Sequence, residues 1–271
     1  MATGKISFGE PDTTWEKYQL LQAPIFFDGN PTKYKAVLRE NKLVSITGRD
    51  YYLFPNEEAL KLGDEAAKLA GLQPFENINA YGMKKVGHAL LNEKETQMRA
   101  MYILENRAAI DGEELNIGVN VFNSIDKSTA FGCGLFSYRY ICGNGVIYGQ
   151  EEIFTIRRIH SSGFQQIIED LKAKILSVME RGIDILDAYN QMAQQKINEE
   201  LAEKLKKSRL SKKVLPDYLK EEEARLQDLT VWTTYNDITE LIWHNRASDL
   251  KTKTHQFQVL HQVIPLEARQ L

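Results

Sequence analysis

Residues 136–148 decide the fold, and they read Phe136-Ser137-Tyr138-Arg139-Tyr140-Ile141-Cys142-Gly143-Asn144-Gly145-Val146-Ile147-Tyr148. The aromatic and β-branched residues on both sides of the glycines favour strands. Asn144-Gly145 is a strong signal for a tight hairpin turn, because both residue types tolerate positive φ angles. The segment therefore predicts an antiparallel hairpin with strands near 131–142 and 146–159.

Further strands are expected upstream, near 79–91, 98–106 and 115–122. In the last of these, apolar residues at 115, 117, 119 and 121 alternate with Asn116, Gly118 and Asn120. This alternation is typical of a half-buried strand in an antiparallel sheet. A helix from about Glu57 to Ala70 is expected before the sheet, and Gly71 is a natural end for it.

The C-terminal half is expected to be helical, beginning with one long helical region from about Phe164 to Ser208. An apolar stripe follows it at spacings of three and four residues, as in a heptad pattern: Ile168, Leu171, Ile175, Val178, Gly182, Ile185, Tyr189 and Met192. Two more helices are expected, near 217–229 and 231–245. Because strands come first and helices follow, the pattern predicts one α+β domain over 1–271, with 23–160 mainly sheet with one helix and 163–250 mainly helical.

Composition narrows the classes of function. The formal net charge is −3, which argues against wholesale coating of nucleic acid but leaves room for a local basic patch. No apolar run approaches the roughly 20 residues that a membrane helix needs, so no membrane association is expected. Cys133 and Cys142 lie an odd number of positions apart in one expected strand, on opposite faces, so free thiols and a cytoplasmic location are expected.

The hairpin offers one candidate nucleic-acid site. Arg139 stands beside the turn at Asn144, and Arg157 and Arg158 belong to the partner strand. A guanidinium group matches phosphate oxygens in two-point geometry, and nearby tyrosines such as Tyr138 are able to stack on bases. The alternative is a structural hairpin in which Arg139 pairs with a carboxylate such as Glu151 or Glu152.

A second candidate is the basic run KLKKSRLSKK at 204–213, which includes Lys204, Lys206, Lys207 and Arg209. Such a run is able to follow a nucleic-acid backbone. It is equally typical of a solvated helix end, where the helix dipole favours cations.

Other chemistry finds little support. Gly143-Asn144-Gly145 begins like a dinucleotide-binding fingerprint, but Tyr148 stands where the last glycine belongs and a strand follows. The histidines and cysteines lack metal-ligand spacing, so no metal or cofactor is expected. A Mg²⁺-dependent nuclease built on Asp28, Glu40 and Lys42 is a minor alternative.

The last expected helix carries a polar row, Asn236, Glu240 and His244, beside Trp232 and Trp243. Residues three and four apart share one helix face. The row is interpreted as a buried polar network that docks the helix on the sheet, with a role in a functional site as the alternative.

Four blocks of the sequence together resemble the phage- and plasmid-associated "domain of unknown function 932" family. They are residues 34–59, residues 123–128, the Arg-x-x-Cys-x-Asn-Gly block at 139–145, and residues 232–244. The second block departs from the family's Ser-His-Asp-Gly-like wording, because Ile125 replaces the histidine and Lys127 the glycine. The resemblance implies a mobile-element setting, in the host cytoplasm if the protein is viral, and supplies no reaction or catalytic residues.

These observations lead to one main expectation and two alternatives. The main expectation is a non-enzymatic nucleic-acid-binding protein, with single-stranded DNA binding or annealing in replication or recombination as its form. The alternatives are the Mg²⁺-dependent nuclease and an oligomeric structural or host-interaction protein. A homo-oligomer would form through the apolar stripe of residues 168–192.

Overall fold

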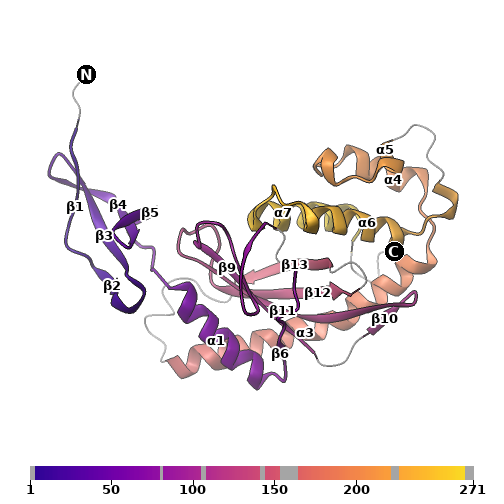
Figure 1. Cartoon of the computed structure of the whole chain (residues 1–271), viewed down its shortest axis with the longest axis horizontal. Coiled ribbons are helices and arrows are strands. Elements are labelled where there is room, and N and C mark those ends of the chain that lie inside the picture. The colour runs from indigo at the N-terminus through magenta and orange to yellow at the C-terminus, as the bar shows by residue number, and fades with distance from the viewer. Residues whose placement is uncertain are drawn as a thin grey trace.

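The computed structural model describes residues 4–79, 82–104, 108–140, 144–152, 164–220 and 226–265 (Figure 1). It contains two antiparallel sheets followed by a mainly helical C-terminal region, which confirms the α+β expectation. Within the described ranges, no helix has the length and apolar character needed to cross a bilayer.

The N-terminal sheet has the order β1-β3-β4-β5, with β2 also pairing with β3. Its strands are β1 (Ile6–Phe8), β2 (Thr13–Trp15), β3 (Leu20–Phe27), β4 (Asn30–Arg39) and β5 (Lys42–Gly48). A small apolar cluster of Leu20, Val37, Leu53 and Ile125 joins this sheet to the rest of the protein. The hydroxyl of Tyr51 donates to the Ser124 carbonyl across the same junction, at 2.9 Å.

The main sheet has the order β13-β12-β11-β9-β8-β7, while β10 pairs with β11 and β6 with β9. Its strands are β6 (Gln73–Pro74), β7 (Lys84–Val86), β8 (Ala89–Leu91), β9 (Gln97–Ile103), β10 (Ala108–Ile110), β11 (Glu113–Ser124), β12 (Gly132–Arg139) and β13 (Asn144–Glu152). The pairing of β12 with β13 is confirmed. The expected turn at Asn144-Gly145 is wrong, because these two residues begin β13 and pair with Arg139 and Tyr138. The strand expected near 79–91 is wrong in one respect, because a turn at Gly87-His88 divides it into β7 and β8.

Helices cover both faces of the main sheet (Figure 1). On one face lie α1 (Asn56–Leu69) and α3 (Phe164–Gln194); on the other lie α6 (Val231–His244) and α7 (Leu250–Val263). Beyond α6 and α7 are α4 (Glu199–Lys207), α5 (Asp217–Lys220) and two 3₁₀ turns, η2 (Lys212–Val214) and η3 (Leu226–Asp228). Side chains alternate along β11, since Val119 and Val121 share the α1–α3 face while Asn120 and Phe122 face α7. The expected half-buried strand is wrong, however, because helices cover both faces and Asn116 and Asn120 are buried as well.

The expected helix to Ser208 is wrong, because it is broken after Gln194. Residues 195–197 instead pair with the segment before α6, through bonds that include Ile197 N–H to the Leu229 carbonyl at 3.1 Å. Asn198 then caps α4 by accepting from the Leu201 N–H at 2.8 Å. An asparagine side chain stabilises a new helix start in this way, and this local capping outweighs continuation of the apolar stripe.

The apolar stripe of α3 lies inside the chain. Its apolar side chains from Ile168 to Met192 are buried against α1 and the main sheet. A Cβ added at Gly182 would lie 2.8 Å from Ile117 Cγ2, so the helix backbone lies close to the sheet at this glycine. The stripe is therefore not an exposed surface, and the interpretation of residues 168–192 as an oligomer interface is corrected: any interface must use other residues.

Candidate nucleic-acid interface

Arg139 forms an ion pair with Glu113. Its Nε lies 2.7 Å from Glu113 Oε2 and its Nη2 lies 3.0 Å from Glu113 Oε1, while the Arg139 side chain is 15% exposed. Arg139 thus pairs with a carboxylate, as the structural alternative expected, but that carboxylate belongs to Glu113 on the neighbouring strand β11 and not to Glu151 or Glu152. A paired, largely covered guanidinium is a poor phosphate ligand, because binding would require the pair to break.

The other hairpin candidates add no visible phosphate site. Asn144 begins β13, and Arg157 and Arg158 lie outside the described residues. Tyr138 is buried, with its ring centroid 4.5 Å from that of Phe75, and its hydroxyl donates to the Asn77 carbonyl. Tyr138 is therefore a core residue rather than a stacking platform.

Part of the basic run is also paired. Lys204 contacts Glu200 at 2.7 Å, and Lys206 and Lys207 contact Glu203 at 3.2 and 3.3 Å. These pairs are highly exposed and join residues one turn apart on α4, so each contributes little and rearranges easily. Arg209, Lys212 and Lys213 are exposed beyond α4, and no ion pair to them is found in the described part of the chain.

The run and the hairpin do not form one site. Figure 1 shows α4 on the outer side of the α6–α7 layer, whereas β12 and β13 lie beneath that layer. Lys213 also lies in a depression together with Asp217, Asp237 and Glu240, so its charge is opposed by nearby carboxylates. Arg209 and Lys212 are the exposed members of the run that make no ion pair with a described carboxylate and do not line this depression.

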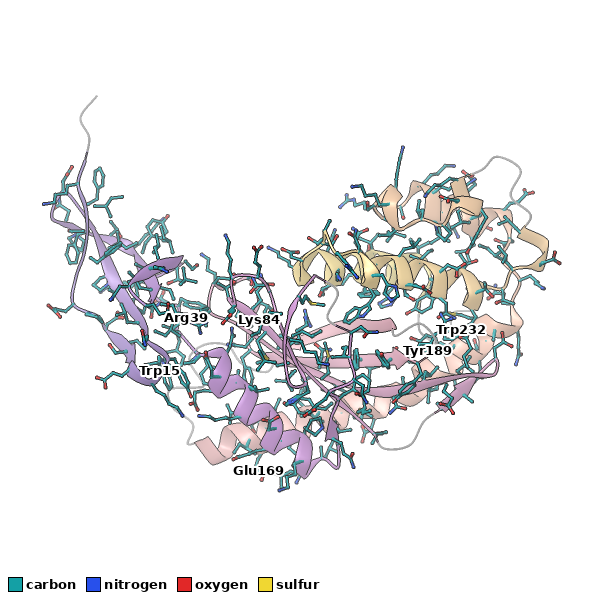
Figure 2. All side chains as sticks on the ribbon, viewed as in Figure 1. Trp15, Arg39, Lys84, Glu169, Tyr189 and Trp232 are labelled. Carbon is teal, nitrogen blue, oxygen red and sulfur yellow. The ribbon has the colours of Figure 1, made fainter. Side chains whose placement is uncertain are left out.

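The polar row of α6 divides between the interior and the surface. Asn236 is 5% exposed, whereas the Glu240 carboxylate is 41% exposed and lies 3.9 Å from His244 Nδ1. Trp232 docks the helix: it points toward Tyr189 of α3 in Figure 2, and the ring centroids are 4.7 Å apart. Tyr189 and Ser137 of β12 are linked through their hydroxyls at 3.2 Å, so this contact reaches the sheet.

Helix α7 provides a basic surface that the sequence interpretation missed. Its exposed side chains are Lys251, Thr252, His255, Gln258 and Gln262, and residues 250–263 include no aspartate or glutamate. The 209–213 segment adjoins it, because the Ser211 N–H donates to Gln256 Oε1 at 2.7 Å. We call Arg209, Lys212, Lys251 and His255 the α7 surface; the missed signal was the lack of carboxylates in a helix that carries two lysines and two histidines.

A cavity of about 250 Å³ opens beside the N-terminal half of α7. Its lining is made of amides, hydroxyls, cations and one methionine, with no carboxylate: Gln97, Met98, Arg99, Ser128, Thr129, Lys251, Thr254, His255 and Gln258. The nearby Asp126 carboxylate accepts from the Ser128 N–H at 2.9 Å instead of lining the cavity.

Arg99 is the buried cation of this cavity, with an exposed fraction of 4%. Its Nη1 donates to Asn120 Oδ1 at 2.6 Å and its Nη2 to Thr254 Oγ1 at 3.1 Å, while the guanidinium carbon lies 5.2 Å from the centroid of the Phe122 ring. No carboxylate pairs with Arg99 among the described residues. Burial lowers the pKa of Arg99 to about 9, which still leaves it charged at neutral pH.

The nuclease alternative fails on geometry. Asp28 lies in the β3–β4 turn and Glu40 in the β4–β5 turn, at opposite ends of the ten-residue strand β4. A strand rises by about 3.3 Å per residue, which places these carboxylates roughly 30 Å apart. They are unable to share one ion, and the described residues include no group of three or more candidate metal ligands.

Comparison with known proteins places the chain in a family. Residues 44–264 match the family described as a domain of unknown function (DUF932). The match covers well over half of the sequence, so the chain belongs to this family. Searches among curated proteins and among solved structures found no match.

Proposed function

We propose that the chain is a non-enzymatic nucleic-acid-binding protein that contacts the phosphate backbone through the α7 surface. One observation carries the proposal: cations of α7 and of the 209–213 segment adjoin on a surface whose helix contributes no carboxylate. Phosphate contacts by lysine and arginine supply most of the sequence-independent affinity for nucleic acid. The hairpin residues first considered play no part in this version.

Single-stranded DNA is the proposed ligand, in replication or recombination of a phage or plasmid. The setting comes from the family resemblance, and the preference for single strands is the part that the experiment has to test. Since the exposed side chains of α7 include no phenylalanine, tyrosine or tryptophan, binding is expected to be electrostatic rather than dominated by base stacking.

The salt dependence can be worked out from the charges. The α7 surface offers three exposed arginine and lysine side chains, Arg209, Lys212 and Lys251. Each phosphate contact with a single strand contributes a slope of about −0.7 in log K against log salt, so three contacts predict a slope of about −2. Fluorescence anisotropy of labelled single- and double-stranded 20-mers between 25 and 300 mM salt measures this slope.

A triple charge reversal tests the location. Arg209→Glu, Lys212→Glu and Lys251→Glu together are expected to reduce affinity at 50 mM salt by more than tenfold. The matched control changes the charge equally on the N-terminal sheet, where Lys5, Lys17 and Lys33 are exposed. An equal loss in both triple variants would assign the effect to net charge and reject the α7 surface; no binding by the unaltered protein at 25 mM salt would reject the function.

The interaction-protein alternative has its own supporting observation. Ile6, Phe8 and Phe27 lie at the outer edge of the N-terminal sheet with exposed fractions of 65%, 49% and 50%, and Ile6 pairs directly with Phe27. Neighbouring exposed apolar side chains of this size are typical of protein contacts. Light scattering against concentration tests self-association, which Phe8→Ser should weaken if this edge is the interface; a monomer at all concentrations would count against it.

A further inference from the structure

The Arg99 cavity is a separate recess with its own chemistry. Arginine is rarely buried without a carboxylate partner, because removing its charge from water is costly. Here the described partners of the guanidinium are the neutral side chains of Asn120 and Thr254 and the Phe122 ring. These two hydrogen bonds engage two of the five N–H donors that a guanidinium carries. The positive charge at the base of the cavity is thus balanced by no described residue.

The remaining lining complements an anion. Lys251 and His255 stand on the exposed face of α7 at the mouth, and Thr254 of the same helix contributes its hydroxyl beside Arg99. Gln97 and Gln258 add amide groups. This set combines cations with hydrogen-bond donors, which is the arrangement that phosphate oxygens require.

The size of the cavity restricts what enters it. A volume of about 250 Å³ lies below the roughly 300–1,000 Å³ of sites that enclose a whole drug-sized ligand. An internal phosphodiester carries a sugar on both sides, so it is poorly able to reach a guanidinium that is 4% exposed. A terminal phosphate has one ester link, enters end-on, and carries a charge of about −1.5 to −2 at pH 7.

We propose that the Arg99 cavity binds a phosphate monoester group, and that its source is the phosphorylated end of a nucleic-acid strand whose backbone lies on the α7 surface. The strand-end source rests on the proposed function, whereas phosphate binding by the cavity does not. The other source of the same chemistry is a free nucleotide or inorganic phosphate. Lys251 contributes to both sites, while Arg99 belongs to the cavity alone.

The test compares three single-stranded 20-mers of one sequence, with a 5′-phosphate, a 3′-phosphate or hydroxyls at both ends. We expect one phosphorylated end to bind at least fivefold more tightly than the hydroxyl form. Arg99→Met should abolish this preference and leave affinity for the hydroxyl form unchanged. Inorganic phosphate and AMP, titrated calorimetrically without DNA, give a readout that does not depend on strand binding.

If Arg99→Met fails to fold, a substitution at an exposed position tests phosphate binding by the cavity instead. Gln258→Glu places a carboxylate at the cavity mouth, and Gln262→Glu places one on the same helix outside the cavity; both side chains are exposed. We expect only Gln258→Glu to abolish the phosphate preference. Equal binding of all three oligonucleotides together with calorimetric binding of phosphate or AMP overturns the strand-end source. Equal binding without calorimetric signal, or equal effects of the two glutamate variants, overturns the cavity.

Discussion

Gly182 offers the sharpest test of how α3 packs on the main sheet. In a helix interior, alanine is normally more favourable than glycine by about 1 kcal/mol. At position 182, however, the added Cβ would lie 2.8 Å from Ile117 Cγ2 and 3.6 Å from Leu135 Cδ1. Optimal carbon–carbon separations are about 3.5–4.0 Å, so the first contact is too short by roughly 1 Å.

The net effect of Gly182→Ala follows from two opposed contributions. Forcing an extra carbon into a packed interior costs about 1–3 kcal/mol, and the gain in helix propensity returns about 1 kcal/mol. We therefore expect Gly182→Ala to lower the free energy of unfolding by about 0–2 kcal/mol. At an exposed helix position, a glycine-to-alanine substitution would instead raise the free energy of unfolding.

Two reference variants separate these contributions. Ala173 is exposed on the same helix, so Ala173→Gly measures helix propensity without a packing change and should destabilise by about 1 kcal/mol. Ile117→Ala removes the opposing methyl group, and in that background Gly182→Ala should become stabilising. Urea unfolding followed by far-ultraviolet circular dichroism gives each free energy. If Gly182→Ala stabilises the unaltered protein by the full 1 kcal/mol, α3 does not lie against Ile117 as described.

Three further predictions concern buried polar groups. Glu113→Ala leaves the largely covered Arg139 without its carboxylate and should lower the free energy of unfolding by about 3 kcal/mol, measured by chemical unfolding. Glu200→Ala removes one partner of a solvent-exposed pair and should cost much less, so equal costs of the two variants would mean that Arg139 is solvated. The Asn123 amide donates to the Phe54 carbonyl, just before α1, and to Oδ1 of Asn56, the first residue of α1, at 2.9 Å in each case. Asn123→Ala removes both hydrogen bonds and should lower the free energy of unfolding by about 1–3 kcal/mol in the same assay. Burial lowers the pKa of His261 to about 3, so the folded state keeps it neutral while the unfolded chain takes up a proton below about pH 6.5. Its contribution to stability is therefore complete above pH 6.5 and declines by up to about 1.4 kcal/mol per pH unit as the pH falls toward 3; an unaltered pH profile in His261→Gln would contradict this.

The sequence predicted the elements whose signals are local. The β12–β13 pairing, α1 and α6 were each predicted from residues within a few positions of one another, although Asn144 and Gly145 belong to β13 and not to the turn. The end of α3 was not predictable in the same way, because the segment that pairs with residues 195–197 lies more than thirty residues later, at Leu229 and Val231. The partner of Arg139 was misjudged for a related reason: Glu113 is distant in sequence and adjacent only once β11 and β12 pair.

The candidate sites illustrate the same limit. The basic run was recognised in the sequence from its consecutive lysines and arginine. The sequence did not show that Glu200 and Glu203 would pair with its first three lysines. The Arg99 cavity takes residues from β9, from the segment after β11 and from α7, three parts of the chain that only the folded sheet and its helical layer bring together. A periodic sequence pattern identifies one face of a single helix or strand. It does not identify this cavity, because three separate segments of the chain line it.

Ile125 and Lys127 lie where the two sheets join. Ile125 is fully buried in the apolar cluster with Leu20, Val37 and Leu53, where a histidine would bring a polar ring into an apolar contact. Lys127 has a φ of 57°, a left-handed conformation that a glycine adopts more easily than a lysine. Leu20 and Val37 precede residue 44, where the family match begins, whereas Ile125 lies within it. Ile125 thus serves the attachment of the N-terminal sheet to the part of the chain that the family match covers.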